Sequence, residues 1–218
     1  MTVMNFALFP DGVYVLADTL VTTDQFEPGF FTSKVHPVPH LNGLICGTGN
    51  LAFILDWSRH VLGRMLAVDM GHLNDFASDS LRTLYAARPA AERKAMTSTI
   101  YHLGFDDQEN QFVGFAYRST ADFESERLEP GIRTKPPYIG ALPLTGFPND
   151  FVEVCRAQRV EQDAIIPAER VFIGGHLTAY MMQVDRMENG AVAVVTTITR
   201  PFEFEDFETM YLVCASTR

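Results

Sequence analysis

Short apolar segments separated by turn residues run along the first part of the chain and predict consecutive β-strands. Val3 to Phe9 is apolar with one polar break, and Pro10-Asp11-Gly12 is typical of a hairpin turn. The segment that follows, Val13 to Ala17, consists of apolar residues that favour strands. We expect these two strands to pair, which returns the chain to its start and brings Asp18 close to Thr2.

The same alternation of strand and turn is expected to continue beyond Asp18. A third strand is predicted from Leu20, and a fourth from Lys34 to Val38. Phe26 to Phe31 contains Pro28-Gly29 and is expected to form the loop between them. This second return of the chain would bring Lys34 to the same place as Asp18.

A fifth apolar segment, Leu44-Ile45-Cys46, ends in Gly47-Thr48-Gly49-Asn50 and leads into a helical pattern from Leu51 to Leu66. Asn50 is a favourable N-cap residue, so we expect the helix to begin directly after it. The apolar residues of this segment recur at helical spacing, which predicts that one face of the helix packs on a sheet.

The rest of the chain predicts a layered α+β fold in a single domain spanning residues 1–218. Helices are expected from Asn74 to Ala87 and from Asp150 to Gln162. A hairpin is expected from Thr97 to Arg118, and the Pro-rich stretch from Thr134 to Pro148 is expected to be a long surface loop. Together these elements suggest two stacked sheets covered by helices.

Thr2 has chemistry that no internal threonine has, once Met1 is removed. Its hydroxyl can attack an amide carbonyl while its free α-amino group, with an ordinary pKa of about 7.7 to 8.0, accepts the proton. A lysine ammonium nearby would lower the pKa of that amine, and Asp18 would hold Lys34 charged and oriented. If Met1 stays in place, the Thr2 nitrogen is an amide without basicity, and this mechanism is blocked.

The glycine-flanked turn before the first helix is a candidate oxyanion site. A turn at a helix N-terminus presents free backbone N–H groups, and we assign this role to Thr48 or Gly49. The alternative is a tight turn between strand and helix that needs glycine dihedral angles whether or not an oxyanion binds.

Several of these segments together resemble the proteasome β-subunits and HslV-type peptidases of the N-terminal nucleophile (Ntn) hydrolases. The resemblance is carried by Thr2, Leu16-Ala17-Asp18, Ser33-Lys34-Val35 and Gly43 to Gly49. Near the other end, Phe172-Ile173-Gly174-Gly175 and the strands around a turn at Met187 to Gly190 are similar to the family's late glycine pair and closing hairpin. The resemblance is poor between about residues 120 and 165.

This resemblance implies a four-layer αββα Ntn-hydrolase sandwich with two antiparallel sheets, in which Thr2, Asp18 and Lys34 are catalytic. It also implies assembly with like subunits into a homo-oligomer and a peptide or amide substrate, whereas an unfoldase partner is not identified. The chain departs from the family at Arg170 and Ile173, where active subunits usually carry aspartate and serine. Tyr138 to Ala141 is the best match to a further serine-containing turn and lacks the serine.

Two functions follow from these observations. The first is a proteasome-like threonine-type peptidase or amidohydrolase that uses Thr2. The second is a catalytically silent structural subunit of a ring, a sheath or a virion-like particle, which the missing polar residues favour.

Composition restricts the partners, cofactors and cellular compartment that we expect for the protein. The net charge of −10 argues against binding to nucleic acid, and the sequence has no apolar run long enough to span a membrane. Because the N-terminus also has no basic region and hydrophobic stretch typical of a signal peptide, we expect a cytoplasmic protein. Cys46, Cys155 and Cys214 are widely spaced, which is typical of reduced core thiols. The six histidines show no ligand spacing, and neither a metal nor a cofactor is expected.

Overall fold

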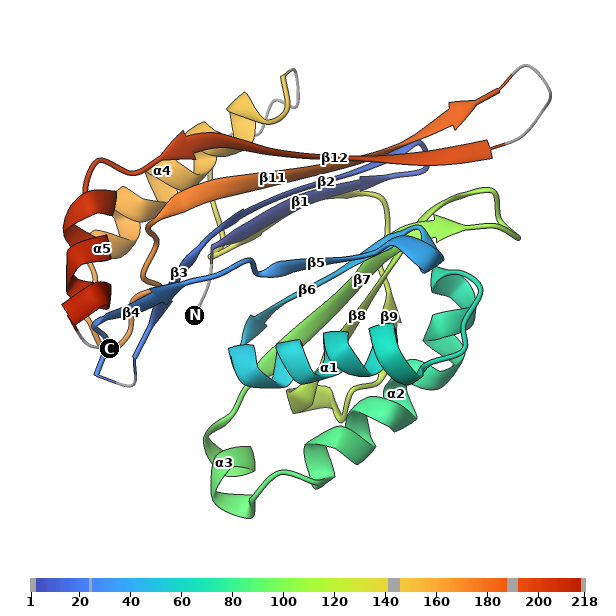
Figure 1. Ribbon diagram of the computed structural model, residues 1–218, viewed down its shortest axis with the longest axis horizontal. Helices are drawn as coiled ribbons and strands as arrows, with labels where there is room; N and C mark the ends of the chain where they lie inside the picture. Colours follow the sequence, from blue (N-terminus) through green and yellow to red (C-terminus); the bar gives the residue numbers. More distant parts are fainter. Residues whose placement is uncertain (1–2, 24, 141–145, 188–191, 217–218) are drawn as a thin grey trace.

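Two five-stranded antiparallel sheets form the centre of the protein in a computed structural model, which describes residues 3–23, 25–140, 146–187 and 192–216 (Figure 1). The first sheet has the strand order β10-β1-β2-β11-β12, with β10 at Gly131–Lys135, β1 at Met4–Phe9, β2 at Gly12–Asp18, β11 at His176–Arg186 and β12 at Val192–Glu203. The second has the order β5-β6-β7-β8-β9, with β5 at Val35–Val38, β6 at Gly43–Gly49, β7 at Ser98–Asp106, β8 at Gln111–Arg118 and β9 at Ser125–Arg127.

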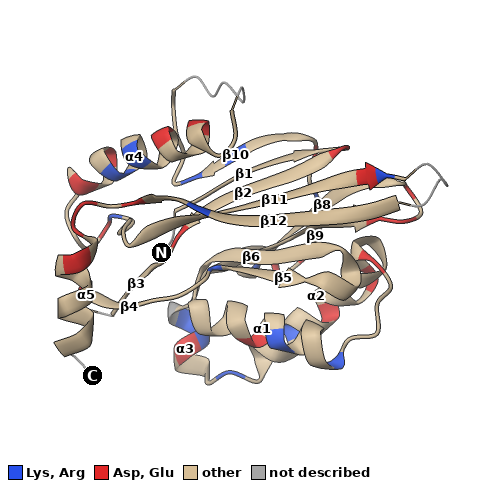
Figure 2. Ribbon diagram, turned by 45° about the horizontal axis from the view of Figure 1, so that its top comes forward, with Lys and Arg blue, Asp and Glu red and all other residues tan. Residues whose placement is uncertain are grey.

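Helices lie beside these sheets (Figure 1). They are α1 at Leu51–Arg64, α2 at Met70–Ala86, α3 at Ala90–Ala95, α4 at Asn149–Asp163 and α5 at Phe207–Ser216. Charged residues lie mainly on the helices and near the ends of strands, whereas the middle parts of the strands in the two large sheets carry few (Figure 2).

Apolar side chains fill the space between the two large sheets. Phe6 of the first sheet contacts Tyr101 of the second, with ring centroids 5.1 Å apart, in a cluster of fully or almost fully buried residues. The outer face of the second sheet packs on α1 and α2 through residues such as Trp57, and the outer face of the first packs on α4 through Phe151. Burial of this apolar area is the main contribution to the stability of the layered arrangement.

The sequence predicted several of these elements correctly. The hairpin of β1 and β2 is confirmed, with Met4 opposite Ala17, and so is the hairpin of β7 and β8. The helix after Asn50 is confirmed as α1, and the Asn50 Oδ1 accepts a hydrogen bond of 2.9 Å from the Phe53 N–H as an N-cap. The late hairpin is confirmed as β11 and β12, although its expected turn at residues 188–190 lies outside the described residues.

The prediction of a four-layer αββα Ntn-hydrolase sandwich with two antiparallel sheets is wrong. The described chain forms three antiparallel sheets, the third being a small sheet of β3 (Leu20–Thr22) and β4 (Pro28–Phe31). Since β11 pairs with β2 through Leu177 and Asp18, no free edge of β2 remains for β3, which pairs with β4 instead. The α5 helix lies beside this small sheet, where the Phe207 and Phe31 ring centroids are 5.1 Å apart.

Three further expectations differ from the structure. The stretch from Phe26 to Phe31 is not simply a loop, because Pro28–Phe31 forms β4. The stretch from Thr134 to Pro148 begins inside β10, and residues 141–145 of it lie outside the described residues. The second helix begins at Met70 rather than Asn74, because Asp69 caps it by accepting a 2.7 Å hydrogen bond from the His72 N–H.

His102 is a buried titratable group in the second sheet. Its Nε2 accepts a hydrogen bond of 2.8 Å from the Trp57 indole, and burial lowers the pKa of His102 to about 3. An unfolded chain binds a proton at this histidine near pH 6.5, so the unfolded state holds more protons between these two values. The contribution of neutral His102 to stability is therefore complete above about pH 6.5 and is lost as the pH falls toward 3.

We expect the free energy of unfolding to fall between pH 7 and pH 4, with His102 contributing up to about 1.4 kcal/mol per pH unit. In His102→Gln, whose amide oxygen can still accept from Trp57, this pH dependence should be weaker. Chemical denaturation at several pH values measures it, with the exposed His40 replaced by glutamine as a control. Equal slopes in the wild type and His102→Gln would contradict this assignment.

Candidate functional site

Asp18 and Lys34, which the sequence predicted to meet, form a buried ion pair. Asp18 is the last residue of β2, and Lys34 directly precedes β5. The Lys34 Nζ donates to the Asp18 Oδ1 at 2.6 Å, and the side chains are 3% and 0% exposed. The structure therefore brings together two of the three residues that we predicted to be catalytic.

The Asp18 carboxylate also accepts hydrogen bonds from the backbone. The Gly174 N–H donates to Asp18 Oδ2 at 3.2 Å, and the backbone of Val3 contacts the same carboxylate. Burial raises the pKa of Asp18 and lowers the pKa of Lys34, while the attraction between the two groups opposes both shifts. Such a lysine releases its proton more readily than one in water, which is a property of groups at reactive sites.

Thr2, the predicted nucleophile, lies outside the described residues. The described chain begins with Val3, which contacts Asp18 through its backbone, and Met4 pairs with Ala17 in the first sheet. The residue that immediately follows Thr2 is thus part of the buried site.

The late glycine pair approaches this ion pair. Gly174 donates to Asp18, and Gly175 has a φ of +78° at which a Cβ would come within 2.4 Å of the Thr19 Oγ1. Thr19 Oγ1 in turn accepts a hydrogen bond of 3.1 Å from the His176 N–H. Gly175 is therefore required by its left-handed backbone conformation and by its close packing against Thr19.

The departures from the family pattern have clear places in the structure. The Arg170 guanidinium lies over the Phe172 ring, 4.1 Å from its centroid, and Ile173 is buried in the core cluster that contains Val3. In Tyr138 to Ala141, the segment that best matches the family's serine-containing turn, Ile139 is 99% exposed and Ala141 lies outside the described residues. None of these described side chains adds a polar contact to Asp18 or Lys34.

Sequence reasoning missed a pair of hydroxyl groups close to Lys34 in the chain. The Ser33 Oγ and the Tyr180 hydroxyl are 2.8 Å apart, and Ser33 Oγ also donates to the Val35 carbonyl oxygen at 2.7 Å. Burial raises the pKa of Tyr180, so this phenol stays protonated. Because Ser33 and Tyr180 are far apart in the sequence, no local pattern could have indicated their contact.

Thr48 and Gly49, the predicted oxyanion residues, lie at the end of β6. The pairing of β5 with β6 ends at Val35 and Cys46, so β5 does not pair with residues 47–49. On the other side β6 pairs with β7 as far as Gly49 and Ser98. On the side of β6 that faces β5, the backbone groups beyond Cys46 are therefore not paired with β5 and can meet a ligand. This position lies directly beyond Lys34, the residue that precedes β5.

Gly49 is conformationally required at this turn. Its φ is +105°, and an added Cβ would lie 2.0 Å from the Thr97 carbonyl oxygen. We expect Gly49→Ala to lower the free energy of unfolding by at least about 1 to 3 kcal/mol, measured by chemical denaturation. Gly63→Ala on the exposed surface of α1, where a Cβ meets nothing within 4 Å, should instead raise it by about 0.5 to 1 kcal/mol. A similar effect of the two substitutions would contradict the assigned backbone strain.

A cavity of about 410 Å³ opens beside these two residues. Its lining combines the ends of β6 and β7 with β10 and consists of Thr48, Gly49, Thr97, Ser98, Thr99, Thr120, Thr134, Lys135, Pro136, Pro137 and Val171. Hydroxyl side chains and one lysine supply its polar groups. No local sequence pattern indicates this cavity, because its walls come from five separate parts of the chain.

Other chemical features are limited in the part of the chain that the structure describes. Cys46, Cys155 and Cys214 are buried and form no disulfide, in agreement with the prediction of core thiols. No cluster of three or more His, Cys, Asp or Glu side chains is arranged to hold a metal ion among these residues. No helix within them is long and apolar enough to cross a membrane.

Comparison with known proteins adds no family assignment. No protein-family model matches the chain, and no curated protein matches it. A functional interpretation therefore depends on the geometry around Asp18 and Lys34 and on the cavity next to Thr48.

Proposed function

We propose that this protein is a threonine-type peptidase or amidohydrolase whose nucleophile is Thr2, exposed by removal of Met1. The observation that carries the proposal is the buried Lys34–Asp18 ion pair, with its 2.6 Å contact and its link to the backbone of Val3. A buried pair of charges is costly to desolvate and contributes little net stability compared with apolar residues, so its contact with the backbone of Val3, the residue that follows Thr2 in the chain, supports a chemical role.

In the proposed reaction, the Thr2 hydroxyl attacks the amide carbonyl and its proton passes to the Thr2 α-amine. The C–N bond breaks as this ammonium returns the proton to the leaving amine, which leaves an ester between Thr2 and the acyl group. Water then attacks the ester, again with the α-amine as base, and releases a carboxylic acid. Lys34 favours the neutral amine and the developing alkoxide, and Asp18 orients Lys34.

The negative charge on the carbonyl oxygen needs hydrogen-bond donors. Thr48 and Gly49 are the residues proposed for this role, and the Gly49 N–H is the one on the side of β6 that β5 leaves unpaired. Thr48 is in register with Asn42 and Asn50, whose backbone groups bond to the β7 side. The cavity that Thr48 and Gly49 line would receive part of the substrate.

Hydrolysis of a panel of fluorogenic peptide amides tests the proposal. We expect Thr2→Ala to reduce turnover by at least about 10³-fold, whereas Thr83→Ala on the exposed surface of α2 should leave it unchanged. Equal turnover by the wild type and Thr2→Ala would show that Thr2 is not the nucleophile.

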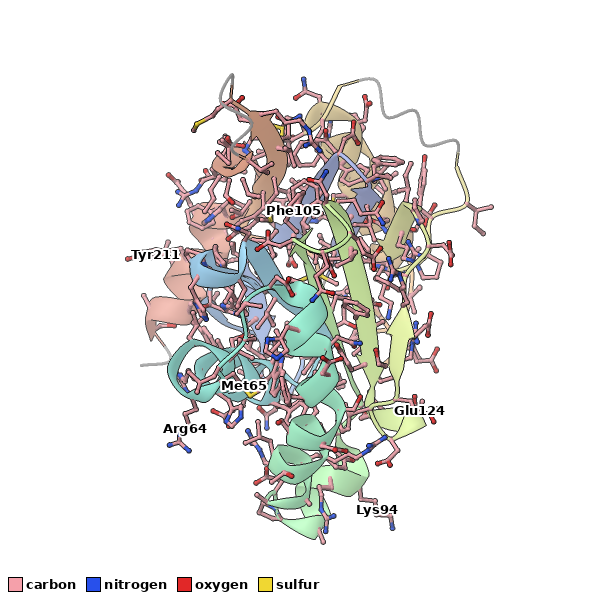
Figure 3. All side chains as sticks on the ribbon, turned by 90° about the vertical axis from the view of Figure 1, so that its right-hand side faces the viewer. Arg64, Met65, Lys94, Phe105, Glu124 and Tyr211 are labelled. Carbon is pink, nitrogen blue, oxygen red and sulfur yellow. The ribbon has the colours of Figure 1, made fainter. Side chains whose placement is uncertain are left out.

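A catalytically silent structural subunit in a homo-oligomer is the second candidate. It is favoured by apolar side chains exposed on β12 and α5, among them Ile198 at 53%, Tyr211 at 56% and Leu212 at 68%. Tyr211 points away from the body of the protein (Figure 3). A stable oligomer that shows no Thr2-dependent hydrolysis with any peptide of the panel would favour this candidate. The buried thiols of Cys46 and Cys155, which form no disulfide, support a cytoplasmic setting for either function.

A further inference from the structure

The cavity next to Thr48 and Gly49 is unusually rich in hydroxyl groups. Six of the residues that line it are threonine or serine. Two of these hydroxyl oxygens accept hydrogen bonds from the protein, Ser98 Oγ from the Asn50 N–H at 3.2 Å and Thr134 Oγ1 from the Tyr138 N–H at 3.0 Å. Hydroxyl groups in such a lining can donate to oxygen atoms of a ligand.

Lys135 is the only charged residue among the described residues that line the cavity. Its Nζ lies 5.3 Å from the centroid of the Tyr101 ring, and no carboxylate of the described residues forms an ion pair with it. The neighbouring cation Arg118 differs, because Glu126 forms a salt bridge with it. Burial and the charge of Arg118 lower the pKa of Lys135, whereas the charge of Glu126, which forms its salt bridge with Arg118, raises it.

The backbone of Lys135 is held in a fixed position relative to the start of the chain. Lys135 pairs with Met4, and its N–H donates to the Asn5 Oδ1 at 3.3 Å. Asn5 is itself fixed by Gln158 of α4, since the Asn5 Nδ2 donates to the Gln158 Oε1 at 2.8 Å and both side chains are fully buried. This buried amide pair therefore fixes the backbone of Lys135 relative to β1, which begins two residues after Thr2 in the chain.

We propose that the cavity receives an acidic side chain of the substrate, aspartate or glutamate, next to the amide that is cleaved, and that Lys135 determines this specificity. The inference rests on the proposed function, because it takes the cavity to adjoin the scissile amide. A volume of about 410 Å³ holds one side chain with room for water. The half-buried ammonium supplies a charge-assisted hydrogen bond that a neutral side chain cannot match.

Equilibrium binding tests the pocket separately from catalysis. Thr2→Ala protein, which cannot form an acyl-enzyme, is titrated with acetyl-Leu-Leu-Glu-amide and with its glutamine counterpart. We expect the glutamate peptide to bind about tenfold more tightly, since a charge-assisted hydrogen bond contributes more than about 1.4 kcal/mol.

Variants of Lys135 identify the source of this preference. In Lys135→Met the two peptides should bind equally, while Lys135→Arg should retain most of the preference for glutamate. Lys94→Met is the matched control, because Lys94 is exposed on α3 and points away from the protein (Figure 3). Equal binding of the two peptides to Thr2→Ala protein, or a preference unchanged by Lys135→Met, would overturn the proposal.

Measurement of turnover then distinguishes the proposal of an acidic pocket from the proposed threonine-dependent hydrolysis. A preference for glutamate in binding, without Thr2-dependent hydrolysis in protein that retains Thr2, supports the acidic pocket and contradicts the proposed function. Thr2-dependent hydrolysis with equal kcat/KM for glutamate and glutamine substrates supports the proposed function and contradicts the acidic pocket.

Discussion

Replacement of Lys34 by methionine is expected to lower the free energy of unfolding by about 3 to 5 kcal/mol and to abolish amide hydrolysis. Methionine fills similar space, but it leaves the Asp18 carboxylate buried without its 2.6 Å partner. Breaking a buried ion pair in this way is much more costly than replacing both of its members. Hydrolysis is lost in addition because the positive charge that favours the neutral Thr2 amine is removed.

Denaturant titration and hydrolysis assays of three variants test this expectation. Lys94→Met, at the exposed lysine of α3, should match the wild type in both measurements. The double variant Asp18→Asn/Lys34→Met should recover much of the lost stability, since no charge stays buried, yet it should not hydrolyse amides. Wild-type stability and activity in Lys34→Met would contradict the role assigned to the pair.

Protein made with additional residues before Thr2 is expected to hydrolyse amides about 10² to 10⁴-fold more slowly than protein that begins with Thr2. In the extended form the Thr2 nitrogen is an amide and cannot act as a base, although its hydroxyl is unchanged. The expected range is the usual contribution of a positioned general base.

A single preparation provides both forms when the extension is removable by a protease that cleaves directly before Thr2. Hydrolysis of the same fluorogenic peptide should appear as the extension is removed, in proportion to the fraction of cleaved chains. Thr2→Ala protein carrying the same extension controls for the added protease and should stay inactive. Full activity before cleavage would show that the α-amine is not the base.

Local sequence patterns were sufficient to predict much of the two large sheets. The β1–β2 hairpin follows from two apolar segments around Pro10-Asp11-Gly12, and α1 follows from helical spacing after the N-cap Asn50. In both cases the residues that define the element are close in the sequence. Their preferences agree with the packing that the rest of the chain imposes.

The third sheet and the last helix could not be predicted in the same way. Whether Leu20 joins the first sheet depends on β11, about 155 residues later, which occupies the edge of β2 through Leu177. The α5 helix at Phe207–Ser216 follows a run of acidic and aromatic residues without a clear helical period. Its position beside Phe31 depends on the small sheet that the sequence did not reveal.

In the candidate site, too, contacts made by short turns could be predicted from the sequence, whereas contacts between distant residues could not. Asp18 and Lys34 could be placed together because short turns return the chain to its start, and their contact is confirmed. The role of Thr2 stays a prediction, since Thr2 lies outside the described residues. The contacts of Ser33 with Tyr180 and of Asn5 with both Lys135 and Gln158 each join residues more than 100 positions apart, so no local spacing indicates them.

The central claim is that Thr2 carries both a free amine and a reactive hydroxyl. The most direct test is intact mass spectrometry of the purified protein before and after treatment with a peptide epoxyketone, a reagent that can bond to both groups of an N-terminal threonine. We expect the wild-type protein to lack Met1 and to gain one adduct at Thr2, with no adduct in Thr2→Ala. A protein that retains Met1 throughout, or one that lacks Met1 and gains no adduct at Thr2, would contradict it.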